Sequence, residues 1–258
     1  MIDTTTRSKH PVLLIHGTAP GVWAALPELL ADGHEVIAYD RMSFGTRRDE
    51  TPQDLSAHAE DAATQIRAAG PSALVIGWSM GGVIALELAA RHPDLVDGLV
   101  LLEPPLHAKK HPSPRMLLAV GGGILRGKLG RDASGARGFL RWALGRRDGS
   151  TDLDRMPAEF GERLAAGDDA AVCAELAFGT GEHIDAALLA RVRCPARVLC
   201  GDQSQPTFGA AAERIVATVP GAELVSVPGS GHAMPLDAAQ TIVQHVNALQ
   251  PVGKESPA

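Results

Sequence analysis

The stretch Leu74-Val75-Ile76-Gly77-Trp78-Ser79-Met80-Gly81-Gly82 decides the fold of this chain. It begins as a short apolar run typical of a buried strand, and the apolar residues 83–90 that follow are typical of a helix. A serine between two glycines, at such a strand-to-helix junction, matches the strained turn that exposes a nucleophilic hydroxyl. The free N–H groups of the helix N-terminus suit a developing oxyanion. The pattern predicts a nucleophile at Ser79, although G-x-S-x-G alone also fits a glycine-rich turn of another α/β fold.

Length and composition are those of one globular domain with an insertion. The chain has 258 residues, of which 45% are apolar and 21% charged, which is ample for one buried core. The residues before His10 are polar, so we expect no secretory signal, and no apolar run is long enough for stable membrane insertion. The three cysteines lack metal-ligand spacing and are interpreted as reduced thiols of a cytoplasmic protein without a metal: Cys173, Cys194 and Cys200.

Strand-like and helix-like segments alternate along most of the chain. This alternation predicts an α/β fold with a mainly parallel sheet of about six strands flanked by helices. It breaks after Pro105, where the composition becomes helical until about Arg193. We therefore expect a core formed by residues 1–105 and 194–258, with residues 106–193 inserted as a helical cap, or lid. The predicted strands are residues 11–17, 35–40, 73–77, 99–105, 197–201 and 223–227.

Four motifs occur in the order typical of one superfamily. They are His16-Gly17 after the first strand, D-R-M-S-F-G at residues 40–45, the turn at Ser79, and Gly229-Ser230-Gly231-His232 after the last strand. From about residue 11 to residue 249 the chain resembles the α/β-hydrolase fold superfamily, and in particular its serine esterases and lactonases. The G-x-S-x-G turn is then the nucleophile elbow of that fold.

The resemblance implies a catalytic role for several residues. His232, on a glycine-rich loop, is the expected general base, which takes the Ser79 proton and returns it to the leaving group. The oxyanion hole is expected from two backbone N–H groups, those of Met80 and of Thr18. Thr18 follows the His16-Gly17 turn, where the family's histidine shapes the oxyanion loop.

The catalytic acid departs from the common pattern. The family usually has an aspartate shortly after the fifth predicted strand, but Ser204 occupies that position in Gly201-Asp202-Gln203-Ser204. A serine cannot stabilise the imidazolium that forms on the histidine. Glu103 ends the fourth strand. Some family members, such as zearalenone-lactone hydrolases, carry their acid at this strand end, and this chain resembles them. We predict that Glu103 is the acid. Asp202 stays open as the rival, although it can also be explained as a turn aspartate that hydrogen-bonds its own backbone.

Two further departures affect the architecture. Ser43 replaces a glycine of the family's D-x-x-G-x-G pattern, so the backbone there is expected to differ locally. About ten residues precede the first strand, so the family's usual first two strands cannot fit. Residues 35–39 are then expected at the sheet edge, and such an apolar edge strand could pair in a homodimer.

The predicted cap is expected to determine the substrate. Residues 116–120 are followed by Gly121-Gly122-Gly123, which we interpret either as a helix end with a flexible joint, as in a moving lid, or as a break between two packed helices. Trp78 and Trp142 are predicted to line the substrate pocket. An apolar pocket of this kind suits a hydrophobic ester or lactone as the small-molecule substrate.

Charge is distributed unevenly. The net charge is −6, but residues 107–147 contain ten basic residues and one acidic residue, a local charge of +9 that leaves −15 for the rest of the chain. Three interpretations stay open: a solvated helical face, attraction of an acidic carrier protein or substrate, and attraction of an anionic membrane surface. Nucleic acid is not an expected partner, because the net charge is negative and no readout motif occurs.

The preferred function is a serine hydrolase that cleaves a carboxylic ester or lactone through a Ser-His-Glu triad and an acyl-enzyme, without cofactor. A thioesterase for carrier-bound acyl chains is one alternative. A cofactor-free lyase or cyclase on the same scaffold is another. A binding protein without activity is supported only by the serine at position 204. Epoxide hydrolases and dehalogenases need a carboxylate where Ser79 stands and are disfavoured.

Overall fold

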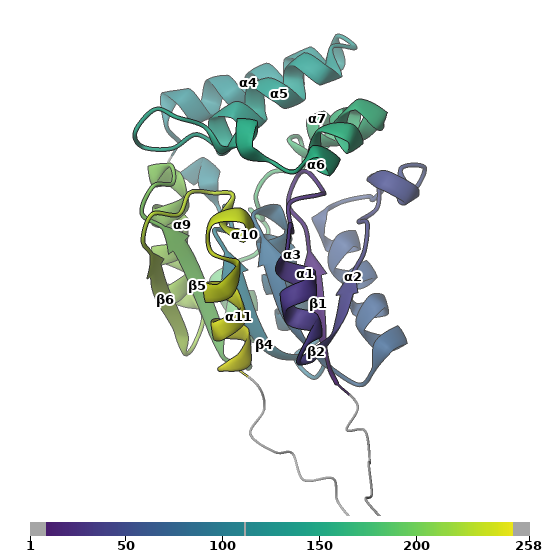
Figure 1. Ribbon diagram of the computed structural model, residues 1–258, viewed down its shortest axis with the longest axis vertical. Coiled ribbons are helices and arrows are strands. Elements are labelled where there is room, and N and C mark those ends of the chain that lie inside the picture. Colours follow the sequence, from purple (N-terminus) through teal and green to yellow (C-terminus); the bar gives the residue numbers. More distant parts are fainter. Residues whose placement is uncertain (1–8, 111, 250–258) are drawn as a thin grey trace, which may run out of the picture.

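The computed structural model describes residues 9–110 and 112–249. Six strands form one sheet in the order β2-β1-β3-β4-β5-β6, and every neighbouring pair is parallel (Figure 1). This confirms the predicted six-stranded sheet with the second strand at its edge. The strands are β1 (His10–Ile15), β2 (His34–Ala38), β3 (Ala73–Trp78), β4 (Val96–Leu102), β5 (Ala196–Gly201) and β6 (Ala222–Val227).

The strand order reverses between β1 and β3. From β1 the chain moves to one edge of the sheet, and from β3 onward it builds toward the other edge. Loops that leave neighbouring strands in opposite directions open a crevice at the carboxyl ends of those strands. The loop after β1 and the turn after β3 flank this crevice, so the topology brings the turn at Ser79 beside the loop at Gly17.

Helices cover both faces of the sheet. Alternate strand residues point to opposite faces, so that Leu13 and Val75 pack with α2, α3 and α9, whereas Leu14 and Ile76 pack with α1 and α11. Asp54 accepts a hydrogen bond from Ala57 N–H at the start of α2. The bounds are α1 (Leu26–Ala31), α2 (Leu55–Ala69), α3 (Met80–Arg91), α9 (Pro206–Thr218), α10 (Met234–Asp237) and α11 (Ala239–Asn247).

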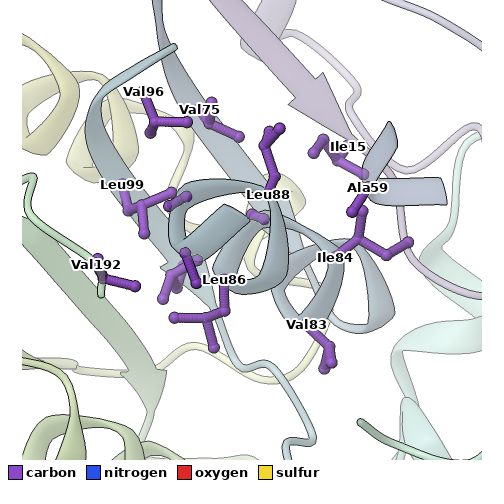
Figure 2. Packing of buried hydrophobic residues seen from close by; sticks show 14 of the residues in the cluster. Ile15, Ala59, Val75, Val83, Ile84, Leu86, Leu88, Val96, Leu99 and Val192 are labelled. Atoms are coloured by element: carbon purple, nitrogen blue, oxygen red, sulfur yellow. The ribbon is translucent and has the colours of Figure 1, made fainter. Parts of the chain in front are cut away.

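Helix α3 is buried along almost its whole length, from Met80 to Ala90. Figure 2 shows its apolar side chains, among them Leu86 and Leu88, surrounded by residues of β1, β3 and β4, such as Val75 and Leu99. Packing on all sides fixes the helix, and therefore fixes the turn that begins it. Functional groups at the end of such an element are held in position by the core itself.

A helical insertion lies between β4 and β5. Helices α4 to α7 lie beyond one end of the strands, at the top of Figure 1, whereas α8 packs against α3. The residue limits of the cap, 106–193, stay a prediction. The helices are α4 (Pro114–Lys128), α5 (Asp132–Ala143), α6 (Ala158–Arg163), α7 (Asp169–Glu175) and α8 (Ala186–Leu189), and single helical turns occur at Gly45–Arg47, Ala108–Lys110, Asp152–Arg155 and Leu164–Asp168.

The interpretation of Gly121-Gly122-Gly123 as a joint or a break is wrong. Helix α4 continues through all three glycines to Lys128. The reason is tertiary packing: a Cβ at Gly123 would lie 2.5 Å from the Leu176 side chain, and one at Gly127 would lie 2.8 Å from Cys173. These two glycines, one helical turn apart, allow α4 to pack closely against its neighbours in the cap. Within the described residues, no helix has the length and apolarity needed to span a bilayer.

Candidate active site

Ser79 occupies the sharp turn between β3 and α3. Its backbone has φ 53° and ψ −121°, a conformation that costs energy for a residue with a Cβ. The flanking glycines are required sterically, because a Cβ at Gly81 would lie 2.0 Å from the Ile15 carbonyl oxygen, and one at Gly77 would lie 2.5 Å from the Gly81 carbonyl oxygen. Strand, turn and helix therefore fit together only with this spacing of small residues.

Three side chains form a continuous hydrogen-bonded row. Ser79 Oγ lies 3.1 Å from His232 Nε2, and His232 Nδ1 lies 2.7 Å from Glu103 Oε2. Because a carboxylate only accepts, the pairing implies an imidazole that donates from Nδ1 and accepts the serine hydroxyl at Nε2. His232 and Glu103 are buried, so little water competes for these bonds. The row brings together residues that are 129 and 153 positions apart in the sequence.

Glu103 is fixed at both carboxylate oxygens. Oε1 accepts from the Gly201 backbone N–H at 2.7 Å, which leaves Oε2 directed at His232. The residue follows β4 and has φ 50°, so it is the second non-glycine of the row in the left-handed region. Strained backbone at two members of one side-chain row is typical of a functional site.

The cysteines do not offer a rival nucleophile. Burial, and then the neighbouring Glu103 carboxylate, raise the pKa of Cys200 to about 12. Burial also raises the pKa of Cys173 to about 11 and that of Cys194 to about 12. A thiol is nucleophilic as the thiolate, which these pKa values disfavour at neutral pH. Over the described residues, no cluster of three or more His, Cys, Asp or Glu side chains is arranged to hold a metal ion.

Two aromatic residues hold His232 in place, one at its ring and one at its backbone. Phe208 stacks on the ring with centroids 3.8 Å apart and planes 13° apart. Trp78 Nε1 donates to the His232 carbonyl oxygen at 2.7 Å. The sequence interpretation missed Phe208, because a single phenylalanine at the start of a helix carries no signal that distinguishes it from a core residue.

Asp202, the alternative candidate for the acid, does not belong to the row of Ser79, His232 and Glu103. Asp202 Oδ1 accepts from the Gly229 N–H at 2.9 Å, so its carboxylate ties the turn after β5 to the loop that leads to His232. No hydrogen bond joins Asp202 to His232 in the part of the chain that the structure describes. Ser204 is buried, and its Oγ has no hydrogen-bond partner among the described residues.

The loop after β1 lies against the nucleophile. A Cβ at Gly17 would lie 2.9 Å from Ser79 Cβ, so this loop approaches the turn closely only with glycine. The Gly17 carbonyl oxygen accepts from Arg41 Nη2 at 2.7 Å and lies 2.8 Å from His16 Nδ1. Because C=O and N–H of a trans peptide point in opposite directions, the Thr18 N–H is directed away from Arg41. The oxyanion hole of Thr18 and Met80 stays a prediction.

His16 completes that arrangement. Its Nε2 accepts from the Arg41 backbone N–H at 3.1 Å, which implies a proton on Nδ1 that is donated to Gly17. Burial, followed by the adjacent Arg41 cation, holds the pKa of His16 well below its ordinary value. The imidazole is therefore neutral near pH 7.

An apolar pocket of about 260 Å³ opens onto the row. Ser79, His232 and Thr18 lie in its wall, together with Trp78 and Trp142. Lys109 is the one permanently charged side chain among the described residues that line it. The other lining residues are contributed chiefly by the cap, and include Met116, Leu117, Val120, Ile124, Phe139, Leu140, Leu144 and Leu176.

Comparison with known proteins identifies the family. Residues 12–245 match the model of the alpha/beta hydrolase family, and the chain belongs to this family. It is 26% identical over 238 residues to the pimeloyl-[acyl-carrier protein] methyl ester esterase of Xanthomonas campestris pv. campestris, a match that covers 90% of this chain and 92% of the relative. Other relatives, such as the 2-hydroxymuconate semialdehyde hydrolase of a Pseudomonas species, match over only 34–36% of their length.

Solved structures share the fold. A thermophilic esterase from Thermogutta terrifontis superposes with a TM-score of 0.74 at 24% identity, over 93% of this chain and 89% of that one. The enol-lactonase from Burkholderia xenovorans superposes with a TM-score of 0.76 at 17% identity, over 94% and 92%. At these identities the likeness establishes the architecture.

Proposed function

We propose that the protein is a serine hydrolase that cleaves a carboxylic ester or lactone of a hydrophobic small molecule. The observation that carries the proposal is the row Ser79–His232–Glu103, with contacts of 3.1 Å and 2.7 Å, at the wall of an apolar pocket. A hydroxyl beside a base that is itself held by a carboxylate is the arrangement that activates a serine.

The reaction follows from the positions of these groups. Ser79 Oγ attacks the substrate carbonyl carbon while His232 Nε2 takes its proton. The N–H groups of Met80 and Thr18 stabilise the oxyanion of the tetrahedral intermediate. The intermediate collapses, His232 protonates the departing alkoxide, and an acyl-serine remains. Water, deprotonated by His232, then releases the acid and restores Ser79. Glu103 stabilises the imidazolium in both halves.

The pocket supports the substrate class. Its wall is formed mainly by aliphatic and aromatic side chains. It therefore favours a substrate whose acyl or alcohol group is largely uncharged. The Xanthomonas relative acts, by its name, on a methyl ester, which agrees with this chemistry. Open-chain esters and lactones both belong to the proposal.

A thioesterase that acts on carrier-bound acyl chains is the second candidate. The Xanthomonas relative, which matches over 90% of this chain, acts, by its name, on an ester attached to an acyl-carrier protein. The local charge of +9 in residues 107–147 would attract such an acidic carrier. The acyl-enzyme chemistry would be the same, with a thiolate as the leaving group.

A substrate panel tests the proposal. Hydrolysis of p-nitrophenyl esters of increasing acyl length, of alkyl lactones and of acyl-N-acetylcysteamine thioesters is followed with the wild type and with Ser79→Ala. We expect esters or lactones with apolar acyl groups to give the highest kcat/KM, and Ser79→Ala to abolish turnover. Preference for the thioester by tenfold or more would support the second candidate. Turnover that survives Ser79→Ala would contradict both and would favour a lyase or cyclase.

A further inference from the structure

Helix α4 presents an unusual outer surface. Six large hydrophobic residues are exposed among those the structure describes, and four of them belong to α4 or its C-cap. These four leucines are 56–76% exposed: Leu117, Leu118, Leu125 and Leu129. Figure 1 places α4 in the layer farthest from the sheet. We call Leu118, Leu125 and Leu129, which share one face of the helix, the leucine stripe.

The faces of α4 have different partners. Gly123 and Gly127 face the other cap helices, as their close contacts with Leu176 and Cys173 require. A second face, which includes Val120 and Ile124, lines the pocket. The leucine stripe lies on the side of the helix opposite the two glycines, and none of its three residues lines the pocket. The helix packs against the cap with one face and lines the pocket with another. The exposed leucines are therefore not needed for either contact.

Cations flank the leucine stripe on both sides. At 100° per residue, Lys128 lies on the side of the stripe toward the pocket, and Arg115 and Arg126 lie on the other side. All three are exposed, and none forms an ion pair with another described residue. An apolar stripe between unpaired basic residues is the pattern of a helix that lies in the interface of an anionic bilayer.

The apolar surface is continuous with the pocket. Leu117 is 56% exposed and also belongs to the pocket wall, so an apolar path leads from the outer surface of α4 toward Ser79. The distribution of charge orients the molecule as well: residues 107–147, which include α4 and α5, carry +9 and the remainder −15, so a negative surface attracts the part of the cap that holds α4 and α5 and repels the rest of the chain.

We propose that α4 is a reversible docking surface for an anionic lipid bilayer, and that it presents the pocket entrance to apolar esters dissolved in that bilayer. A second copy of the chain fits this surface poorly, because each copy would bring the same positive charge. An acidic carrier protein would neutralise the basic residues of α4, but the exposed leucines would still lack an apolar environment. The docking itself is independent of the proposed function, whereas the delivery of esters rests on it.

Vesicle sedimentation tests the docking surface. The wild type is mixed with vesicles of phosphatidylcholine alone and with vesicles that contain 30% phosphatidylglycerol, about the anionic fraction that attracts basic segments. We expect binding to the anionic vesicles only, and its loss in high salt. Leu118→Ser/Leu125→Ser and Arg115→Gln/Arg126→Gln should each lower the partition coefficient by about tenfold or more.

Matched controls lie outside the surface. Leu224→Ser removes an exposed leucine from β6, and Arg191→Gln/Arg193→Gln removes two exposed cations that precede β5; both should bind vesicles as the wild type does. Hydrolysis of a soluble short-chain ester should be unchanged in the stripe variant, since Leu118 and Leu125 do not line the pocket.

Several results would overturn the docking proposal. These are no binding to anionic vesicles, equal binding to neutral ones, or unchanged binding by the stripe variant. A dimer in solution that Leu118→Ser/Leu125→Ser disrupts would assign the surface to a second copy. Binding of a purified acyl-carrier protein that Arg115→Gln/Arg126→Gln abolishes, without vesicle binding, would assign it to a carrier.

The buried Arg41 side chain connects the cap with the loop that follows β1. Arg41 is completely buried, and its guanidinium connects two parts of the molecule: Nη1 donates to Glu175 Oε1 of α7 at 2.6 Å, and Nη2 donates to the Gly17 carbonyl oxygen at 2.7 Å. Phe44 lies against the guanidinium, with 4.9 Å from Cζ to the ring centroid. A cap residue thus holds the cation that orients the Gly17–Thr18 peptide.

We infer that Arg41 and Glu175 are positioning residues, which keep the Thr18 N–H directed at the oxyanion. The inference rests on the proposed function. Loss of the ion pair would free the Gly17 carbonyl to rotate, and with it the Thr18 N–H. Donors to an oxyanion act mainly on the transition state, so the expected effect is on kcat with little change in KM.

Glu175→Gln tests this inference, with Arg163→Gln as the matched control. Arg163 joins the cap to Asp40 of the core but does not contact Gly17. We expect Glu175→Gln to lower kcat about tenfold, to leave KM within about twofold, and to weaken a trifluoromethyl ketone inhibitor by the factor lost in kcat/KM. Arg163→Gln should lower the melting temperature without that loss.

A second variant covers the case in which Glu175→Gln does not fold. Arg41→Lys keeps the charge, but its single ammonium cannot reproduce the planar fork that contacts both Glu175 and Gly17, so the same fall in kcat is expected. A folded Glu175→Gln or Arg41→Lys enzyme with wild-type kcat and inhibitor affinity would refute the positioning role. Failure of the proposed function is distinguishable, since the wild type itself would then lack Ser79-dependent hydrolysis.

Discussion

Glu103 and His232 meet at 2.7 Å although 129 residues separate them, and the carboxylate reaches the imidazole from the end of β4. The position after β5, where this family usually has its aspartate, is occupied by Ser204. The Gly201 N–H holds the second oxygen of Glu103, so the backbone at the end of β5 fixes this carboxylate.

Substitution of Glu103 by Gln tests its role. The amide can still accept a hydrogen bond, but it cannot stabilise the imidazolium and can favour the wrong tautomer. We expect kcat to fall by about 10³–10⁴-fold with little change in the melting temperature. Asp202→Asn, which alters only the turn near Gly229, should cost less than about tenfold. The reverse ranking of the two variants in steady-state kinetics would exclude Glu103 as the acid.

The carboxylate that orients His232 should also function from position 204. Ser204 is buried beside the end of β5, and its Oγ lacks a hydrogen-bond partner among the described residues, so an aspartate side chain there would start from the family's usual position. We expect Glu103→Ala/Ser204→Asp to recover at least about tenfold of the activity lost in Glu103→Ala. Equal activity of the single and double variants would show that the position no longer has access to His232.

The glycines around the nucleophile should be intolerant of even a methyl group. Alanine at Gly81 would improve helix propensity, but its Cβ would lie 2.0 Å from the Ile15 carbonyl oxygen. We expect Gly81→Ala to cost about 3 kcal/mol or more in the free energy of unfolding, measured with urea. Gly33→Ala is the control, since nothing lies within 4 Å of its added Cβ, and a change within about 0.5 kcal/mol is expected. Similar costs at both positions would contradict the packing argument.

Stability should fall in mild acid because of His58. Burial, followed by the cations Arg41 and Arg47, lowers the pKa of His58 from 6.5 to about 2. Below the unfolded pKa the unfolded chain binds a proton that the native state does not, so the free energy of unfolding decreases by about 1.4 kcal/mol per pH unit as the pH falls. Urea titrations between about pH 6 and pH 4.5 should give a slope shallower by that amount for His58→Gln. Parallel curves for the two proteins would contradict the assignment.

The fold was predictable from the sequence because its signals are local. Buried strands of a parallel sheet appear as short apolar runs, and the break in their alternation after Pro105 correctly predicted a helical insertion. Ser79 and His232 were placed by motifs of neighbouring residues. Glu103 was predicted from the resemblance to family members that carry their acid at the end of this strand, after Ser204 was found at the usual aspartate position.

What the sequence did not reveal depends on contacts between distant segments. The run Gly121-Gly122-Gly123 was misinterpreted because α4 continues through it, and the close approach of Leu176 to Gly123 involves a residue some fifty positions later in the chain. The stacking of Phe208 on His232 and the pairing of Arg41 with Glu175, 134 residues apart, have no local signature. Such contacts arise only when segments far apart in the sequence pack together, within the cap, within the core, or between the two as for Arg41 and Glu175.

The central claim is that Ser79 is an activated nucleophile. Intact-mass spectrometry after incubation with a fluorophosphonate tests it most directly, on the wild type and on Ser79→Ala, with circular dichroism to establish that both are folded. We predict one covalent adduct on the wild type and none on Ser79→Ala. A folded wild type that takes up no probe, or a Ser79→Ala variant that is still labelled, would contradict the account.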